Sequence, residues 1–417
     1  MAKNKIIAAI DIGSSKVATL VAQVREEDPT KLHIVGAASS VSKGVRKGQI
    51  VNIEEAVSCI EESVEAAERM AGYNIAKAWV SVGGSHIGSM NSQGVVAVAQ
   101  PQGEVTASDV ARVMEAAKAV SLPTSAEIIH VIPRSFTVDG QEGVKDPVGM
   151  TGVRLEVETH IVTGFTTAIK NLTKCVAEVG CDVEGVVFGG LAAAEAVLSD
   201  TEKELGVVLV DIGGGTTDVA IFVEGALSYS AVLPVGAKNV TNDLAIGLRV
   251  SLESAEKIKL ALGGAKPKED DLDLSDLGLP EEMKSVSYKT LVEGIIRPRL
   301  NELFSIVAGE IKKSHLVGLT PSGLVVVGGG AMTVGIVESA KRVLSAPVRV
   351  GIPTGITGLI DDIENPSYAA SVGLLHYANK LDNEDAGRGK AWGNPLEKIS
   401  GSGILGKITD LVKSLLP

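Results

Sequence analysis

The most specific chemical signal in the sequence is a pair of aspartates that lie about half a chain length apart. Asp11 stands in IIAAIDIGSSKVATLVAQV, which begins at Ile6, and Asp211 stands in GVVLVDIGGGTTDVAIFVE, which begins at Gly206. Both segments run from an apolar strand through Asp-Ile-Gly and small residues into a second apolar strand. Internal self-similarity of this kind predicts two related halves.

Each segment predicts a β-hairpin whose turn can approach a phosphate group. Glycines allow close backbone approach and positive φ, so that successive N–H groups point at an anion. Hydroxyl side chains add donors, and a lysine adds a positive charge. The expected role of Asp11 and Asp211 is to hold a hydrated Mg²⁺, which needs few protein carboxylates. The candidate phosphate-binding residues are Gly13, Ser14, Ser15, Lys16, Gly213, Gly214, Gly215, Thr216 and Thr217.

The alternative interpretation of either turn is a tight hairpin with glycine for geometry alone, because neither fits GxGxxG or GxxxxGK[ST]. A third signal favours a ligand. The apolar strand Leu324–Val327 leads into three glycines, which leave room for a flat ring at the carboxyl end of a strand. The helical segment SLESAEKIKLALGG adds a Glu and a Lys three residues apart, a spacing that a surface ion pair would also give. The residues concerned are Gly328, Gly329, Gly330 and Met332 after the strand, and Glu256 and Lys259 on the helical segment.

The composition limits the partners that the chain can have. Its 417 residues are 45% hydrophobic but 3% aromatic and include 47 glycines, a profile that suits an α/β protein. A net charge of −12 offers no basic surface for nucleic acid, so no nucleic-acid partner is expected. The three cysteines have no CxxC spacing and favour neither a disulfide framework nor a zinc site. No run is apolar for long enough to span a bilayer, so any membrane contact must be peripheral.

The turns and glycines, in this order and spacing, resemble the phosphate-1, phosphate-2 and adenosine motifs of the actin, Hsp70 and sugar-kinase superfamily. The resemblance implies an α/β, actin-like (ribonuclease H-like) two-domain fold that closes on ATP and Mg²⁺. It implies that Glu256 and Lys259 match the superfamily's Glu-x-x-Lys, which reaches the nucleoside. The two connecting helices are expected to begin near Asn52 and near Pro366.

A compact unit interrupts the first half at about residues 86–162. It predicts strands at 92–99, 127–138 and 153–162 around one helix, which starts with the capping-box pair Thr106 and Asp109. This small α+β unit is similar to subdomain 1C of the FtsA family of bacterial cell-division proteins, and the hinge segment VEGVVFGGLAAAEAVL is close to the FtsA pattern. The implied division of the chain is 1–85, 163–205 and 366–380 for subdomain 1A, 86–162 for 1C, 206–240 and 320–365 for 2A, 241–319 for 2B, 381–402 for a flexible linker and 403–417 for a membrane-targeting helix.

One departure from the superfamily concerns hydrolysis. MreB-like and Hsp70-like relatives have Glu-Pro where this chain has Gly189-Gly190, and in MreB-type relatives that glutamate is expected to position the attacking water. Phosphoryl-transfer enzymes need such a group, and Glu195 is a poor substitute by position. We therefore expect ATP binding with weak or no hydrolysis.

A helix in the predicted subdomain 2B carries the candidate partner-binding residues. The segment LVEGIIRPRLNELFSIVAGEIKKS reads as a strong helix interrupted by Pro298, and it holds Arg299 and Glu302. This motif is similar to the FtsA helix that receives the C-terminal tail of FtsZ. Arg299 can pair with a carboxylate of that tail through two hydrogen bonds. An i, i+3 surface pair with Glu302 is the alternative.

The last residues predict an amphipathic helix on a polar, glycine-rich linker. At 100° per residue its apolar side chains form one stripe, and at roughly 20 Å the helix is too short to span a bilayer but can lie in the interface of an anionic membrane. A helix that docks on the parent domain is the alternative. The candidate membrane-binding residues are Ile404, Leu405, Lys407, Ile408, Leu411, Val412, Lys413, Leu415 and Leu416.

The resemblance implies an ATP-loaded protein that forms filaments with itself and tethers FtsZ polymers, the Z ring, to the cytoplasmic face of the membrane at the division site. It implies that other division proteins are recruited there. Two alternatives stay open: an actin-fold small-molecule kinase, which would have no use for the terminal helix, and an actin-like adaptor of another membrane assembly.

Overall fold

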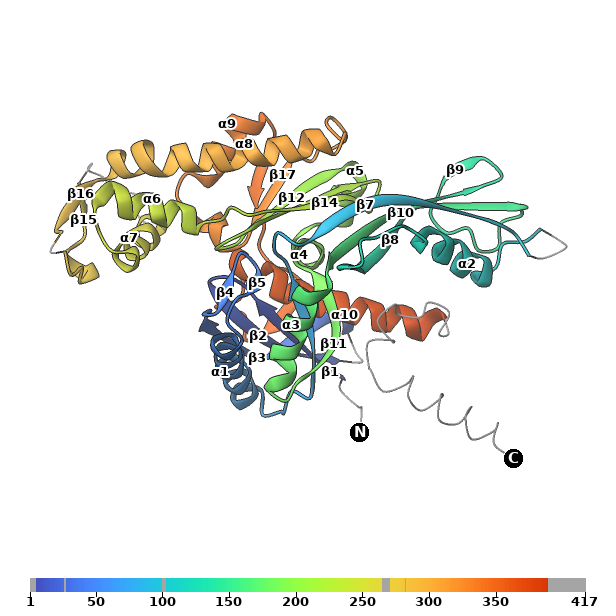
Figure 1. Ribbon diagram of the computed structural model, residues 1–417, viewed down its shortest axis with the longest axis horizontal. Helices are drawn as coiled ribbons and strands as arrows, with labels where there is room; N and C mark the ends of the chain where they lie inside the picture. Colours follow the sequence, from blue (N-terminus) through green and yellow to red (C-terminus); the bar gives the residue numbers. More distant parts are fainter. Residues whose placement is uncertain (1–4, 26–27, 100–102, 265–270, 282, 389–417) are drawn as a thin grey trace.

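The structure, a computed structural model, describes residues 5–25, 28–99, 103–264, 271–281 and 283–388. Two lobes lie one above the other, and a smaller unit projects from one end of the molecule (Figure 1). Both sheets are built from Val, Ile, Leu and Ala, and each lobe has its own buried apolar core. Within the described residues, no helix is long and apolar enough to cross a membrane.

The first lobe contains a six-stranded sheet in the order β11-β6-β1-β2-β3-β19. Strands β1, β2 and β3 are antiparallel neighbours, whereas β6 runs parallel to β1 and β11 runs parallel to β6. The α1 helix begins after Asn52, close to the expected start, and the Asn52 side chain accepts a hydrogen bond from the Glu55 backbone N–H. Contrary to our expectation that it is one of the two connecting helices, it packs on β2 and β3 within the first lobe. The elements are β1 Lys5–Ile12, β2 Lys16–Arg25, β3 Asp28–Val41, β4 Val45–Arg46, β5 Gln49–Ile50, α1 Ile53–Ala71, β6 Lys77–Val82, α3 Thr166–Glu178, β11 Asp182–Phe188 and β19 Ile356–Gly358.

The second lobe contains a five-stranded sheet in the order β14-β13-β12-β17-β18. This is the same order and direction of strands as β3-β2-β1-β6-β11 in the first lobe, which confirms the predicted duplication and the actin-like fold. The elements are β12 Val207–Ile212, β13 Thr217–Val223, β14 Ala226–Leu233, α6 Lys238–Leu248, α7 Leu252–Gly264, β15 Asp271–Asp273, β16 Ser285–Ser287, α8 Arg297–Lys313, β17 Leu324–Val327, α9 Ile336–Leu344 and β18 Val348–Val350.

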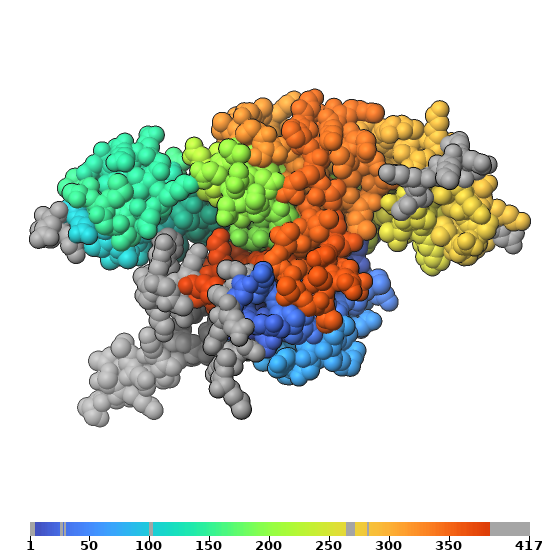
Figure 2. Space-filling view, turned by 180° about the vertical axis from the view of Figure 1, so that it is seen from behind, coloured from blue at the N-terminus to red at the C-terminus, as the bar shows by residue number. Residues whose placement is uncertain are grey.

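Two helices pack against each other between the lobes, α4 (Gly189–Val197) and α10 (Ala369–Arg388). Gly373 permits the close approach, because a Cβ at that position would lie 1.8 Å from the Ala192 carbonyl oxygen. The chain crosses from the second sheet to the first between β18 and β19, and Figure 2 shows this orange segment joining the lobes on the face opposite to that of Figure 1. A short helix, α5 (Asp200–Leu205), precedes β12.

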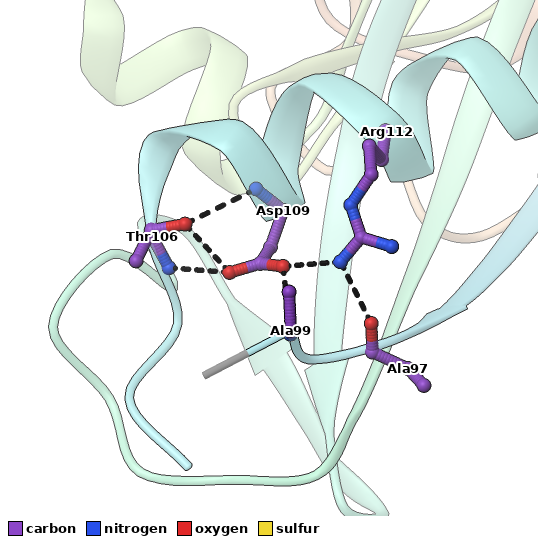
Figure 3. Close-up of polar contacts among 5 residues, drawn as sticks. All are labelled: Ala97, Ala99, Thr106, Asp109 and Arg112. Atoms are coloured by element: carbon purple, nitrogen blue, oxygen red, sulfur yellow. Dashed lines mark hydrogen bonds and ion pairs between the residues drawn. The ribbon is translucent and has the colours of Figure 1, made fainter. Parts of the chain in front are cut away.

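The projecting unit consists of four strands and one helix with a separate core. The sequence predicts its helix and three long strands but misses the short β9. The predicted capping box is present, and the buried Asp109 side chain also accepts hydrogen bonds from the Ala99 backbone N–H and from Arg112 (Figure 3). The elements are β7 Gly88–Ala97, α2 Ala107–Lys118, β8 Ala126–Val138, β9 Gln141–Val144 and β10 Arg154–Phe165.

Three expectations about local structure need correction. Pro298 does not break the helix, because a π-helical segment, Thr290–Ile296, runs directly into α8, and Pro298 lies at this junction, where the backbone hydrogen-bonding pattern changes. The predicted linker at 381–402 begins too early, since α10 continues to Arg388 and a polar segment can extend a helix without an apolar stripe. The expected domain boundaries at 162/163 and 240/241 fall inside β10 and α6.

Candidate functional site

A groove between the two lobes contains a cavity of about 720 Å³. The two hairpin turns line it from opposite sides, and residues that follow β17 and lie on α7 complete its wall. The structure brings fifteen of the predicted nucleotide-binding residues into this wall: Asp11, Gly13, Ser14, Ser15, Lys16, Asp211, Gly213, Gly214, Thr216, Glu256, Lys259, Gly328, Gly329, Gly330 and Met332. Residues far apart in the sequence therefore form one site.

Gly215 and Thr217, the remaining two candidates, are not part of the cavity wall. A Cβ at Gly215 would lie 3.0 Å from the Ser14 hydroxyl oxygen, so this glycine allows the two turns to touch. The buried Thr217 hydroxyl donates a hydrogen bond to the Val235 carbonyl at 2.8 Å and thereby supports the turn from behind.

The two turns have the same backbone geometry. The Gly13 N–H donates to the Lys16 carbonyl at 3.0 Å, and the Gly213 N–H donates to the Thr216 carbonyl at 2.9 Å. None of the four turn glycines has a positive φ, contrary to our expectation. Their use is close approach instead, since a Cβ at Gly214 would lie 2.0 Å from the Ser15 hydroxyl oxygen across the groove.

Asp11 and Asp211 face the same cavity from the two lobes. The carboxylate of Asp11 is oriented by the Ser81 hydroxyl at 2.6 Å and the Ser371 hydroxyl at 3.2 Å. Burial and the neighbouring Asp11 carboxylate raise the pKa of Asp211 to about 7. A divalent cation between these carboxylates would relieve this repulsion. The described residues contain no group of three or more His, Cys, Asp or Glu that could hold a metal, so Mg²⁺ would need water and ligand oxygens besides them.

Asp218 is a functional candidate that the sequence reasoning missed. It pairs with Asp211 across the β12–β13 ladder and lies buried in the cavity wall. Burial, together with Asp211 and Asp11, raises the pKa of Asp218 well above its usual range. A Cβ at Gly189 would lie 3.0 Å from the Asp218 carboxylate, so the position that lacks the superfamily's glutamate lies beside another carboxylate. The only signal for Asp218 in the sequence was its place as the acidic residue at the end of DIGGGTTD.

The Glu256–Lys259 pair is not a surface ion pair. The Lys259 side chain is buried, and its ammonium donates to the Glu256 carboxylate at 2.7 Å and to the Thr241 hydroxyl at 2.9 Å. The Thr241 hydroxyl in turn donates to Glu256 at 2.5 Å. The three side chains form a polar cluster in the wall of the cavity, which Met332 also lines.

Lys16 lies in the cavity wall but has partners of its own. Its ammonium donates to the Ser367 hydroxyl at 3.0 Å and lies 3.2 Å from the centroid of the Tyr368 ring. Burial lowers the pKa of Lys16 to about 8. Glu195 is outside the wall and pairs with Lys203 at 3.1 Å and Lys380 at 3.5 Å, which makes it unavailable as a substitute for the missing glutamate.

The predicted partner-binding arginine is held inside its own lobe. The Arg299 guanidinium forms two hydrogen bonds with Asp243 on α6, at 2.5 and 2.9 Å, and a third contact with Glu302. Asp243 is a partner that the sequence reasoning missed, because it precedes Arg299 by more than fifty residues. The predicted membrane-binding residues 404–416 lie outside the described residues.

Comparisons with known proteins match this chain over most of its length. Residues 84–163 match the family model described as "SHS2 domain inserted in FTSA", and residues 208–373 match that of "Cell division protein FtsA". The chain is 41% identical to the cell division protein FtsA of Pseudomonas aeruginosa, over 90% of this chain and 89% of that protein. It is 36% identical to the FtsA of Escherichia coli, over 90% and 91% of the two chains.

Solved structures of lower sequence identity share the fold. A chain of the PilM–PilN type IV pilus biogenesis complex superposes with a TM-score of 0.63 at 16% identity, over 89% of this chain and 98% of that chain. MreB 5 of Spiroplasma citri, solved with AMPPNP bound, gives a TM-score of 0.55 at 12% identity, over 92% and 99%.

Proposed function

We propose a function from the premise that this chain belongs to the FtsA family of cell division proteins. It is accordingly an actin-like cell division protein. The finer proposal is that it binds ATP with Mg²⁺ in the groove between its lobes, forms filaments, and tethers FtsZ polymers to the cytoplasmic face of the membrane. At that site it would help to recruit other division proteins.

The observation that carries the nucleotide proposal is the convergence of both hairpin turns and the Glu256–Lys259 pair on one cavity. Backbone N–H groups and hydroxyls of the turns suit a phosphate chain, and the polar cluster with Thr241 suits the hydroxyls of a ribose. Asp11 and Asp211 would hold Mg²⁺ through water, and the metal would supply positive charge at the phosphates. Two features of α4 support slow hydrolysis. Position 189, where MreB-like and Hsp70-like relatives have glutamate, is a glycine. Glu195, further along the helix, is already paired with Lys203 and Lys380.

Asp211→Asn tests the nucleotide site. In the presence of Mg²⁺ we expect the affinity for ATP to fall about tenfold or more, because a neutral amide is a poor ligand for a hard cation. In EDTA the variant should bind ATP as well as the unchanged protein or better, since one repulsive charge has gone. Titration calorimetry with and without Mg²⁺ measures both values. Asp200→Asn, on the exposed surface of α5, is the control, and an equal response to Mg²⁺ in all three proteins would contradict the proposal.

The membrane proposal rests on the apolar stripe of residues 404–416. One short helix binds a bilayer weakly, and a filament would raise the effective concentration of each further helix. Leu411→Glu with Leu415→Glu should release the protein from anionic liposomes in a co-sedimentation assay with FtsZ and ATP. Ser402→Glu with Ser414→Glu adds the same charge outside the stripe and should stay largely bound. Equal sedimentation of the two double variants would refute the tether.

A further inference from the structure

Lys238 is a positively charged residue of the groove wall that belongs to neither hairpin turn. It is the first residue of α6, and its backbone is anchored to the second turn. The Ala237 N–H donates to the Gly213 carbonyl, and the Lys238 N–H donates to the Gly214 carbonyl, both at 2.9 Å. The start of the Lys238 side chain is therefore fixed relative to the turn of the second lobe.

The side chain of Lys238 crosses the groove to the first lobe. Its ammonium donates a hydrogen bond to the backbone carbonyl of Ser14, in the opposite turn, at 2.6 Å. An ammonium has three donors, so a single carbonyl leaves two of them for other acceptors. The charged side chains that interact electrostatically with this ammonium are Glu256 and Lys259 on α7 and Arg46 on β4. Glu256 and Lys259 belong to the polar cluster with Thr241.

The other two lysines of the wall are already engaged. Lys259 is paired with Glu256, and Lys16 binds Ser367 and covers the Tyr368 ring. Within the described residues, Lys238 has no carboxylate partner at ion-pair distance, although three aspartates line the same cavity. A polyphosphate that entered this acidic groove would require positive charge close to both turns, and Lys238 can supply it.

We propose that Lys238 is a phosphate-binding residue, whose ammonium binds an oxygen of the nucleotide's phosphate chain while it ties α6 to the first turn. The inference rests on the proposed nucleotide site and adds a residue to it. It follows that a ligand with phosphates draws the two lobes together through Lys238, whereas a nucleoside without phosphates makes no use of this side chain.

The test compares ATP, ADP and adenosine, each with Mg²⁺, by competition against a fluorescent ATP analogue. Lys238→Met keeps most of the side-chain length but removes the charge, and loss of one charge-assisted hydrogen bond should weaken ATP and ADP binding about tenfold or more. Adenosine binding should stay unchanged. Lys238→Arg should restore most of the affinity for ATP, and Lys341→Met on the exposed surface of α9 should match the unchanged protein.

Two results would overturn the inference while leaving the nucleotide site in place. One is an ATP affinity of Lys238→Met equal to that of the unchanged protein. The other is an equal loss of affinity for ATP and for adenosine, which would mean that Lys238 holds the two lobes together but does not bind phosphate. If the unchanged protein itself fails to bind ATP with Mg²⁺, the proposed function fails, and the inference falls with it.

Discussion

Asp11, Asp211 and Asp218 bring three carboxylates into one groove, and their mutual repulsion defines the chemistry of the site. Burial and the neighbouring negative charges raise the pKa values of Asp211 and Asp218. Asp211 and Asp218 therefore favour a proton or a cation nearby. Serine hydroxyls orient Asp11 from two elements of the first lobe, β6 and α10, so its position is fixed before any ligand arrives.

Arg299 gives a prediction at the same scale. Its guanidinium is held by Asp243, so an incoming peptide carboxylate has to compete with that pair or share it. We expect Arg299→Ala to weaken binding of the FtsZ C-terminal tail peptide about tenfold, because a charged hydrogen-bond donor is lost. Asp243→Asn should strengthen binding, since it releases the guanidinium from its internal partner.

Fluorescence anisotropy with a labelled tail peptide measures both effects. Arg342→Ala, an exposed arginine on α9, is the matched control and should bind like the unchanged protein. If Arg299→Ala also matches the unchanged protein, the peptide site lies elsewhere.

Among the elements, the projecting unit shows how one buried charge organises a small fold. Asp109 caps α2 and also accepts the Ala99 N–H just beyond the end of β7, while Arg112 reaches the Ala97 carbonyl of β7 (Figure 3). Burial acts to raise the pKa of Asp109. The hydrogen bonds from Thr106, Arg112 and Ala99 outweigh this effect and hold the pKa well below its usual range. The helix and the edge strand are thus locked to each other by a single carboxylate.

Asp109→Asn should destabilise this unit by about 2 kcal/mol, because the charged hydrogen bonds weaken and the amide cannot accept all of them. Hydrogen exchange followed by mass spectrometry should show faster exchange in β7 and α2 than in the two lobes. Glu115→Gln, on the exposed side of the same helix, should change stability by less than about 0.5 kcal/mol. Unchanged exchange in Asp109→Asn would argue against the locking role.

In the whole molecule, the projecting unit is attached to both lobes and not only to the lobe from which its chain emerges. His160 on β10 lies buried between Asn91 on β7 and Ser230 on β14, at 2.7 and 2.9 Å. The Asn91 oxygen can only accept, so Nδ1 of His160 carries the proton and Nε2 accepts from Ser230. Ser89, Asn91 and Arg134 add hydrogen bonds to β14. Relative movement of the lobes would strain this contact.

This buried histidine predicts a pH dependence of stability. Burial, with repulsion from Arg134 and His130, lowers the pKa of His160 to about 3 in the folded protein, whereas the unfolded value is about 6.5. Because the unfolded state binds the proton first, the stability that His160 contributes is complete above pH 6.5 and is lost as the pH falls from there toward 3.

Urea unfolding at pH 7 and pH 5 measures the effect. His160→Gln should be less stable than the unchanged protein at pH 7, and this difference should shrink by about 2 kcal/mol at pH 5. A constant difference for His160→Gln would contradict the buried neutral state.

Local features of the sequence were sufficient for much of the fold. The two Asp-Ile-Gly turns and the Thr106–Asp109 capping box depend on neighbours a few residues away, so spacing alone predicted them. Predictions that depended on one local rule without its surroundings were wrong, as with the positive φ of the turn glycines and the interruption at Pro298. The turn glycines serve close approach instead, and the helix continues past Pro298 through a change from π-helical to α-helical hydrogen bonding.

The sequence by itself determined the duplicated turns, the fold and the identity of most residues in the groove. Only the tertiary structure decided that Asp218 lines the same groove as Asp11 and Asp211, that Lys238 reaches Ser14 and that Arg299 is held by Asp243. Such contacts join residues from separate elements, and their distances are set by how two sheets, α6 and α8 pack. Hydrogen bonds and charges act over a few ångströms in space, whatever the separation along the chain, and only the folded arrangement of the elements specifies which groups come within that range.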